Sequence, residues 1–218
     1  MSDFDKFVKL LAQTDGRDKI YKFLGGVLKI LATVEAGHPR AASYKAVGSS
    51  ITDGRSLLRM AKWTGDVPKM HSIVALYTEK GTVEMKKIIE FLRVLGNFLY
   101  VLGDNTAFLM RYKLLPGKAK QVQHHSKIAQ FWGFFFAAVL DLVALRKALL
   151  KRASDAATSQ KEAKAALISL AKDGADVFVT MAAVGYMKEV WHPSAVTSGA
   201  LTALSGGIAT YLNWKKIK

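Results

Sequence analysis

The C-terminal segment 194–218 places the strongest constraint on how this chain can fold. It begins with an uncharged run of apolar and small residues, AVTSGALTALSGGIATYLN, and ends on a tail that contains Lys215 and Lys216. Trp191 and Trp214 flank the uncharged run. Its length approaches the roughly 20 apolar residues of a membrane-spanning helix, and tryptophan and lysine are typical of the membrane boundary. The segment therefore predicts a C-terminal transmembrane helix with a basic tail.

The composition of the chain favours a membrane as its partner. Half of the 218 residues are apolar, yet the formal net charge is +15. Basic groups beside apolar helices are attracted to an anionic phospholipid membrane, at roughly 1 kcal/mol for each lysine or arginine near the surface. Nucleic acid is the alternative partner of a basic chain. Cysteine is absent, which excludes a disulfide framework and thiolate chemistry.

Few prolines and little alternation of β-branched residues favour an all-α fold. Ser159, followed by Glu162, is predicted to cap one helix, and Ser194 is predicted to cap the last one. The predicted helices cover, approximately, residues 3–13, 18–35, 40–64, 71–80, 83–114, 118–152, 159–189 and 194–213. We therefore expect a multi-helix membrane-associated bundle with an interfacial amphipathic helix and a C-terminal transmembrane helix.

The N-terminal residues predict an amphipathic helix without a cleaved signal. One helical face carries four apolar residues, Phe4, Phe7, Val8 and Leu11. No long apolar stretch follows, and the acidic residues Asp3 and Asp5 do not fit a mitochondrial presequence. We expect internal segments to bring the chain to its membrane from the cytosolic side.

The segment 40–64 combines an apolar stripe with a basic flank. Seven of its residues are predicted to contact the membrane: Val47, Ile51, Arg55, Leu58, Arg59, Lys62 and Trp63. A basic face beside an apolar one is typical of a helix that lies in the headgroup plane. An ordinary bundle helix with a solvated basic flank would show the same pattern. Gly48 and Gly54 weaken the isolated helix by about 1 kcal/mol each.

A second hydrophobic stretch covers residues 128–145, with Asp141 as its only charge. As a helix it would be about 27 Å long, close to the roughly 30 Å thickness of the hydrocarbon layer. It is either a second span or a hydrophobic hairpin partner for the C-terminal helix, and residues 88–103 compete for the same role. An even number of spans would place both termini on one side of the membrane.

Small residues at a spacing of four mark one face of the predicted C-terminal helix. They are Gly199, Ala203 and Gly207. Such faces let two helices approach closely in lipid, which predicts self-association into a homo-oligomer. The alternative is a small-residue face that packs inside a soluble bundle.

The chain carries none of the common nucleotide-binding, metalloprotease or serine-hydrolase motifs. The adjacent pair His124 and His125 points in two directions on a helix and makes a poor chelating site. Asp104 and Asn105 predict a buried polar node. Asp141 is a functional-site hypothesis because it lies in a hydrophobic helix, although pairing with a neighbouring lysine or arginine is favoured. We expect no catalytic residues, cofactor or metal.

The segment Thr14-Asp15-Gly16-Arg17-Asp18-Lys19, with the aromatic-rich helix after it, resembles the peroxin eleven family of peroxisomal membrane proteins. A second matching block is Leu102-Gly103-Asp104-Asn105. The residues that carry the resemblance are Thr14, Gly16, Arg17, Asp18, Lys19, Asp104 and Asn105. The whole chain looks most like the short glycosomal member, with Lys215 and Lys216 in a dilysine-type end.

The resemblance implies a location in the peroxisomal or glycosomal membrane, with both termini in the cytosol. Family members elongate and tubulate that membrane before fission, through an amphipathic helix and through self-association. The amphipathic helix falls here on residues 47–63, within an amphipathic helical region 1–115. A helical hairpin 116–193 and the transmembrane segment 194–218 follow. The dilysine end resembles a coatomer-binding signal, or it anchors the last span, and fission machinery is a further implied partner.

Two other functions remain open from the residues. A channel or solute carrier of the same membrane would line its pathway with Asp104, Asn105 and Asp141. A soluble nucleic-acid module would use the net positive charge, but the chain lacks a recognisable reading motif, so we expect no nucleic-acid partner.

Overall fold

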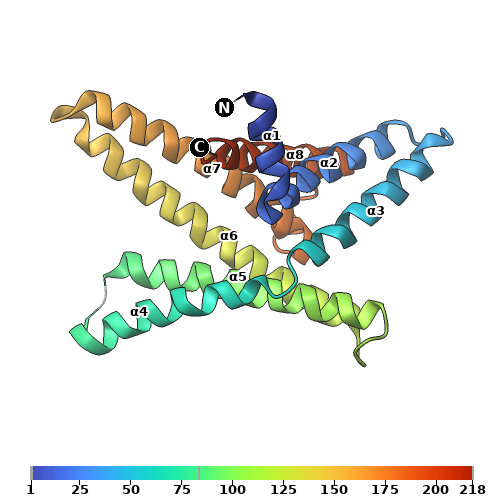
Figure 1. Ribbon diagram of the computed structural model, residues 1–218, viewed down its shortest axis with the longest axis horizontal. Coiled ribbons are helices and arrows are strands. Elements are labelled where there is room, and N and C mark those ends of the chain that lie inside the picture. The colour runs from blue at the N-terminus through green and yellow to red at the C-terminus, as the bar shows by residue number, and fades with distance from the viewer. Residues whose placement is uncertain (1, 83, 218) are drawn as a thin grey trace. The chain divides into compact units, whose positions relative to one another are not determined.

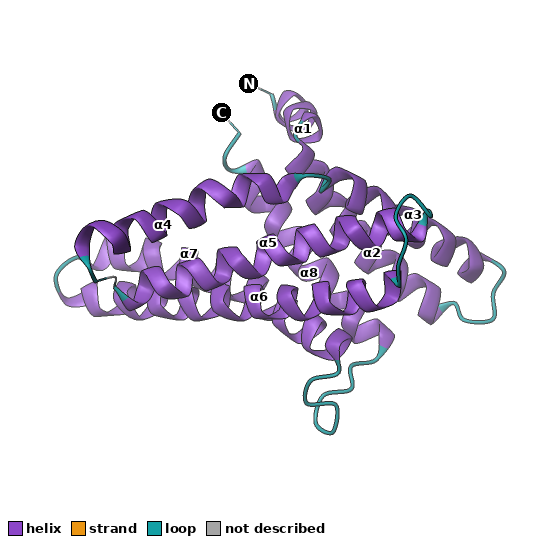
Figure 2. Ribbon diagram, turned by 90° about the horizontal axis from the view of Figure 1, so that it is seen from below, coloured by secondary structure: helices purple, strands orange, loops and turns teal. Residues whose placement is uncertain are grey.

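The computed structural model describes residues 2–82 and 84–217, and every regular element in this part of the chain is helical (Figures 1 and 2). The predicted all-α fold is confirmed. Met1, Val83 and Lys218 lie outside the described residues, and with them the predicted first residue of one helix and the last lysine of the tail.

The chain forms two compact units, residues 1–60 with 181–218 and residues 61–180. The first unit contains α1 (Asp3–Ala12), α2 (Thr14–Val34), α3 (Arg40–Leu58) and α8 (Ala195–Trp214). The second unit contains η1 (Lys62–Asp66), α4 (Val67–Lys80), α5 (Met85–Arg111), α6 (Ala119–Leu150), η2 (Lys151–Ala153) and most of α7 (Ala156–Val184). The predicted three-part division of the chain remains a prediction.

The turn between α1 and α2 explains the glycine of the Thr-x-Gly-Arg-Asp-Lys block. Gln13 adopts an extended conformation that ends α1, and α2 begins at Thr14 rather than near Asp18 as predicted. A Cβ atom on Gly16 would lie 2.0 Å from the carbonyl oxygen of Leu10. Only glycine therefore allows the two helices to meet at this angle.

Helices α2 and α8 pack backbone against backbone. A Cβ atom on Gly26 would lie 2.5 Å from the Ala203 amide nitrogen, and one on Gly206 would lie 2.5 Å from the Phe23 amide nitrogen. The contacts run in opposite directions along the two helices, so the pair is antiparallel. Because the glycines remove side chains from the crossing, α2 holds α8 along much of its length.

Helix α3 packs on the neighbouring side of α2. A Cβ atom on Gly25 would lie 3.7 Å from Ile51, one on Gly48 would lie 4.0 Å from Leu28, and one on Gly54 would lie 3.9 Å from Tyr21. These distances are ordinary van der Waals contacts. The predicted helix 40–64 is too long, because α3 ends at Leu58 and Ala61 takes a left-handed conformation with φ of 57°. Residues 62–66 then form the separate 3-10 helix η1.

The second unit is organised around the antiparallel pair α5 and α6. A Cβ atom on Gly96 would lie 2.7 Å from both Cα and N of Gly133, and one on Gly103 would lie 2.8 Å from Cβ of Ser126. The buried Ser126 hydroxyl donates to the Tyr100 carbonyl oxygen at 2.9 Å. These small residues were not among the predicted contacts, although their spacing of seven on both helices indicates a crossing.

Helix α7 differs from its predicted bounds at both ends. It begins at Ala156, where the Asp155 carboxylate accepts from the Thr158 amide at 3.0 Å. The predicted Ser159 cap is therefore wrong; that side chain is buried and donates to the Ala148 carbonyl oxygen of α6 at 2.8 Å. The helix ends at Val184 because Gly185 has a φ of 78°. In contrast, the predicted Ser194 cap of α8 is confirmed, since its hydroxyl accepts from the Thr197 amide at 3.0 Å.

Within the described residues, the one helix whose length and composition suit a membrane span is that of residues 119–153. It contains the predicted stretch 128–145, and few of the residues in its apolar window are buried. Helix α8 forms over the predicted C-terminal segment but does not meet the same test, so its role as a span remains a prediction. The predicted span candidate 88–103 lies in α5, which carries the small-residue contacts with α6.

Candidate functional site

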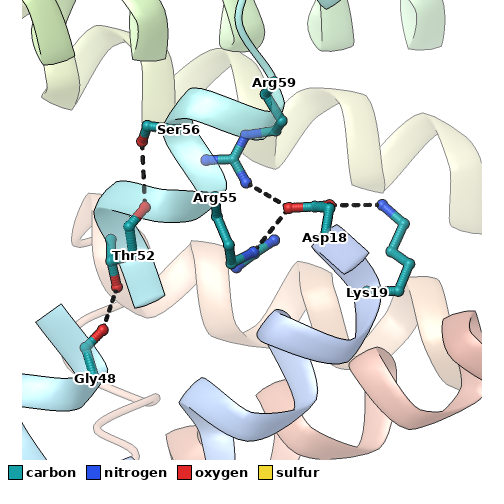
Figure 3. A network of polar contacts seen from close by, with 7 residues as sticks. All are labelled: Asp18, Lys19, Gly48, Thr52, Arg55, Ser56 and Arg59. Atoms are coloured by element: carbon teal, nitrogen blue, oxygen red, sulfur yellow. Dashed lines mark hydrogen bonds and ion pairs between the residues drawn. The ribbon is translucent and has the colours of Figure 1, made fainter. Parts of the chain in front are cut away.

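The most connected polar cluster in the first unit is centred on Asp18 (Figure 3). Asp18 lies on α2 and is 1% exposed. Arg55 Nε donates to its Oδ1 at 2.9 Å, Arg59 Nη1 donates to the same oxygen at 3.2 Å, and Lys19 Nζ donates to Oδ2 at 3.1 Å. Three cations from two segments of the chain therefore converge on one buried carboxylate.

The electrostatics of this cluster hold Asp18 in its charged form. Burial by itself raises the pKa of the Asp18 carboxyl, but the charges of Arg55, Lys19 and Arg59 outweigh burial and hold that pKa well below its usual range. Arg59 is buried and Arg55 is mostly covered, so Asp18 supplies the charge that compensates them. We define these four residues as the Asp18 cluster. It joins α2 to the end of α3.

This geometry changes the interpretation of the predicted membrane-binding residues. The Arg55 and Arg59 side chains, predicted to face lipid headgroups, instead point at Asp18. Ile51 lies against α2, and Leu58 is half-buried at the last turn of α3. Val47 is exposed.

The last two predicted membrane contacts, Lys62 and Trp63, lie in η1 of the second unit. The Trp63 ring packs edge-on against Phe98 of α5, with centroids 5.9 Å apart. The predicted single helix over residues 47–63 is thus not continuous. Its seven residues are divided between the end of α3 and η1, on either side of the left-handed Ala61.

Asp104 and Asn105 form the predicted buried polar node in the second unit, each 4% exposed. The Asn105 side-chain oxygen accepts from the Ala61 amide at 3.1 Å and so holds the left-handed turn that follows α3. A second buried carboxylate, Asp66, accepts from the Asn97 side-chain amide and from Lys69. The hydrogen bond between Asn105 and the Ala61 amide fixes the turn at Ala61. The hydrogen bond between Asn97 and Asp66 fixes η1 to α5.

The small residues predicted to mediate self-association contact a helix of their own chain. A Cβ atom on Gly199 would lie 2.9 Å from the Gly26 carbonyl oxygen, and the Ala203 backbone faces the same glycine. A Cβ atom on Gly207 would meet the Phe23 ring at 3.6 Å. Gly206, which is not one of the predicted residues, makes the closer contact. Self-association through this stripe remains a prediction, and in the single chain α2 occupies it.

Large apolar side chains lie exposed on several helices, among them α6 and α1. On α6 they include Trp132, Phe135 and Leu142, which lie between two basic ends. On α1 the four residues of the predicted apolar stripe are all exposed. The sequence identified the α1 stripe but did not predict that it would remain uncovered.

The basic tail follows α8 without leaving the first unit. Lys215 Nζ lies 4.5 Å from the centroid of the Tyr211 ring, and Ile217 is 8% exposed. Lys216 is exposed. The predicted sorting or anchor residues therefore belong to a tail that is partly packed against the fold.

One carboxylate pair lies between α6 and α7 in the second unit. Asp141 interacts with Asp173 and also with Lys172 and Ser169, while its Oδ2 atom is buried without a hydrogen-bond partner. The favoured pairing of Asp141 with a neighbouring cation stays a prediction, because Lys172 Nζ donates to Asp173 Oδ1 at 2.6 Å. No group of three or more potential metal ligands is arranged around an ion-sized site in the described part of the chain.

Comparison with known proteins identifies relatives over most of the chain. Residues 4–214 match the family described as Peroxisomal biogenesis factor 11 (PEX11). The chain is 26% identical to Peroxisomal membrane protein 11B of Arabidopsis thaliana over 227 aligned residues, which cover 96% of this chain and 95% of that protein. It is 24% identical to the Peroxisomal membrane protein 11 homolog of Dictyostelium discoideum over 152 residues, covering 69% of this chain and 59% of that protein. No solved structure matches the chain.

Proposed function

Because this chain belongs to the peroxisomal biogenesis factor 11 family, we propose that it elongates and tubulates the organelle membrane and thereby promotes proliferation and division. We further propose that the organelle is a peroxisome of the glycosomal type, with both termini of the chain in the cytosol. The proposed partners are anionic phospholipid, further copies of the chain, the fission machinery and coatomer. The curated relatives, which are named peroxisomal membrane proteins, support the location.

The observation that carries the proposal is the exposed apolar surface of α6. Trp132, Phe135 and Leu142 face outward from a helix that is long enough to cross a bilayer. Burial in lipid removes such surface from water at about 25 cal/mol for each Å². The basic residues at both ends of α6 suit the headgroup regions on either side. We infer that α6 anchors the chain in the membrane.

Membrane elongation requires a second step in addition to anchoring. An apolar helix face that inserts into one leaflet adds area to that leaflet alone, which favours curvature. Self-association of anchored chains concentrates these insertions along a tubule. The segment 47–63 would insert with all of its predicted residues only after Ile51 leaves α2 and after Arg55 and Arg59 leave Asp18. We therefore infer that a helix whose apolar face is already free makes the first insertion.

The test is expression of the full chain in cells whose peroxisomes contain a fluorescent matrix protein. We expect the chain in the carbonate-resistant membrane fraction and an increase in peroxisome length with expression level. Unchanged peroxisome length, with the chain still in the membrane fraction, would refute elongation and leave the anchor intact. Release of the chain by carbonate would refute the anchor itself. Protease protection of tags at the two termini tests their proposed cytosolic location.

The Asp141–Asp173 pair favours a second candidate, a channel or solute carrier of the same membrane. A carboxylate with a buried unpartnered oxygen in an apolar helix is expensive in lipid and is typical of ion pathways. The Asn105 side chain, in contrast, accepts a hydrogen bond from the Ala61 amide. Holding that turn is an alternative to its predicted place in a pathway. Planar-bilayer conductance that changes on Asp141→Asn would support the candidate, and a silent bilayer containing the purified chain would oppose it.

A further inference from the structure

The C-terminal end of α6 combines exposed leucines with exposed cations. Leu149 and Leu150 are 53% and 71% exposed, and both lie within two turns of the predicted apolar stretch of this helix. Arg146 and Lys147 precede the two leucines, and Arg152 follows them in η2, where α6 turns toward α7 (Figure 1). Apolar and basic side chains therefore lie side by side at this end of α6.

Packing against α7 determines which face of this end points outward. Ala148 is fully buried, and the Ser159 hydroxyl of α7 donates to its carbonyl oxygen at 2.8 Å. At 3.6 residues per turn, Arg146 and Leu150 lie about 160° around the helix from Ala148. The exposed Leu142 lies on the same side as Arg146. The outward face of α6 thus continues beyond the apolar stretch and gains positive charge there.

Nearby acids do not neutralise the cations of this face. Glu162 is engaged by Lys151 at 2.9 Å, and Asp155 caps the first turn of α7. Asp141 lies on the α7 side of α6, where it interacts with Asp173. Three cations at this end form no ion pair within the described residues: Arg146, Lys147 and Arg152. The outward face therefore carries a net positive charge.

The position of this face matches the headgroup layer of a bilayer. If residues 128–145 cross the hydrocarbon, Leu149 lies about 6 Å beyond it, at 1.5 Å per residue. The headgroup layer on each side is itself roughly 6 Å thick. Because Cα–Cβ bonds point toward the N-terminus of a helix, the two leucines point back toward the acyl chains. The long arginine and lysine side chains can reach the phosphates.

The N-terminal end of α6 lacks this combination. His124 lies as far before the apolar stretch as Leu149 lies after it, and His124 is exposed. Residues 118–127 contain lysines, but no large apolar side chain is exposed among them. Side chains at this end also point away from the hydrocarbon. The two ends of α6 are therefore chemically different.

We propose that the C-terminal end of α6 docks on an anionic phospholipid leaflet. Five residues form this α6 docking surface: Arg146, Lys147, Leu149, Leu150 and Arg152. The inference rests on the proposed membrane anchor and assigns anionic phospholipid to one end of α6. The leucines match the acyl boundary, and the three cations match the phosphates above it.

The experiment exploits the absence of cysteine from the chain. The full chain carries a single Leu149→Cys substitution labelled with a fluorophore, and the matched control carries His124→Cys. Both are reconstituted into vesicles of equimolar phosphatidylcholine and phosphatidylserine, with either lipid present in part as a spin-labelled form. We expect spin-labelled phosphatidylserine to quench position 149 more strongly than spin-labelled phosphatidylcholine does. At position 124 this preference should be smaller.

The contribution of charge is measured in the Leu149→Cys background. Arg146→Gln and Arg152→Gln should each lower the relative affinity for phosphatidylserine by up to about fivefold, which corresponds to about 1 kcal/mol each. The matched control replaces Lys118 and Lys120 by glutamine at the other end of α6. It should leave the preference at position 149 unchanged.

Four outcomes would overturn the proposal. The two spin-labelled lipids could quench position 149 equally, positions 149 and 124 could show the same preference, or the arginine substitutions could leave the preference unchanged. Fluorescence that changes with protein density, without quenching by lipid, would show that this surface binds a second copy of the chain.

Failure of the proposed function gives a different result. A phosphatidylserine preference at position 149, with unchanged peroxisome length in cells, would refute elongation and leave the α6 docking surface intact. Loss of that preference, with peroxisomes that still lengthen on expression, would refute the docking surface alone.

Discussion

The substitution Asp18→Asn tests whether the Asp18 cluster holds α2 and α3 together. It replaces the buried carboxylate by an amide of the same shape and leaves the surrounding cations in place. The amide retains one acceptor oxygen, but its NH₂ group is a donor that faces either the two arginines or Lys19. We therefore expect the cluster to lose both its charge balance and at least one hydrogen bond.

The expected magnitude follows from the exposure of each partner. The Lys19 side chain is 33% exposed, so solvent screens its interaction with Asp18 and little is lost there. The Arg55 and Arg59 side chains are 22% and 9% exposed, and both would remain as poorly solvated charges. Removing one partner of a buried ion pair typically costs 3–5 kcal/mol. We take about 3 kcal/mol, because Arg55 retains some access to water.

Hydrogen exchange measured by mass spectrometry on the full chain in detergent resolves the two units separately. A local loss of about 3 kcal/mol corresponds to roughly 10²-fold faster exchange of the protected amides in α2 and α3. Peptides from α5 and α6 serve as the internal control and should not change. The matched control Asp3→Asn removes an exposed acid from the first turn of α1 and should cost at most about 1 kcal/mol.

Exchange of α2 and α3 in Asp18→Asn within threefold of the parent chain would show that the Asp18 cluster does not hold these helices together. The same conclusion follows if the double change Asp18→Asn with Arg59→Met is no more stable than Asp18→Asn alone. Removing the buried cation together with its partner should recover part of the loss, since the two residues are coupled.

The same cluster predicts how stability depends on pH. The pKa of the Asp18 carboxyl lies below its usual value in the folded state. The stabilisation is therefore fully present above the unfolded pKa of about 4, and it is lost as the pH falls toward the folded pKa. Protection of α2 and α3 should therefore be steady from about pH 7 to 5 and decline below about 4. In Asp18→Asn this component of the acid-induced decline should be absent.

At the α5–α6 crossing, Gly96→Val should lower the thermal midpoint by the equivalent of about 1–3 kcal/mol, because its Cβ would overlap Gly133; an unchanged midpoint in detergent would contradict the close approach. Gly174→Ala, whose Cβ would meet no atom within 4 Å, should raise the midpoint by removing a glycine from a helix. Ala61→Gly should keep or raise the midpoint. Relief of about 1–2 kcal/mol of left-handed backbone strain offsets the larger conformational entropy that glycine loses on folding. Asn105→Ala should lower the midpoint by the equivalent of about 0.5–1.5 kcal/mol, because the part-buried hydrogen bond from the Ala61 amide is lost.

The helices themselves were largely predictable from the sequence, because local residues determine them. Ser194 caps α8 as its position before an apolar run predicted, and apolar periodicity located every major helix. Predicted helix ends were wrong where the end of a helix depends on backbone conformation and not on residue type. Ala61 is left-handed without being glycine, so nothing in the sequence marked the end of α3 before it.

The partners of charged residues were not predictable from local spacing. Arg55 and Arg59 are four residues apart on the flank of an apolar stripe, a pattern shared by solvated, lipid-facing and ion-paired arginines. Their actual partner, Asp18, lies 37 and 41 residues earlier in the chain. The resemblance identified Asp18 as part of a motif, but a motif does not state which remote side chain completes it.

Small residues show why the same pattern supports two opposite interpretations. Glycine and alanine at a spacing of four permit close approach of any helix, in lipid or in a bundle, so the stripe on α8 could not distinguish a second chain from α2. The distinguishing information is on the partner, where Gly26 removes the side chain that would keep Ala203 away. With the α8 stripe occupied by α2, large apolar side chains still lie exposed on several helices, among them Trp132, Phe135 and Leu142 of α6. Because α6 also has the length and composition of a membrane span, contact with lipid is better sought there than on the α8 stripe.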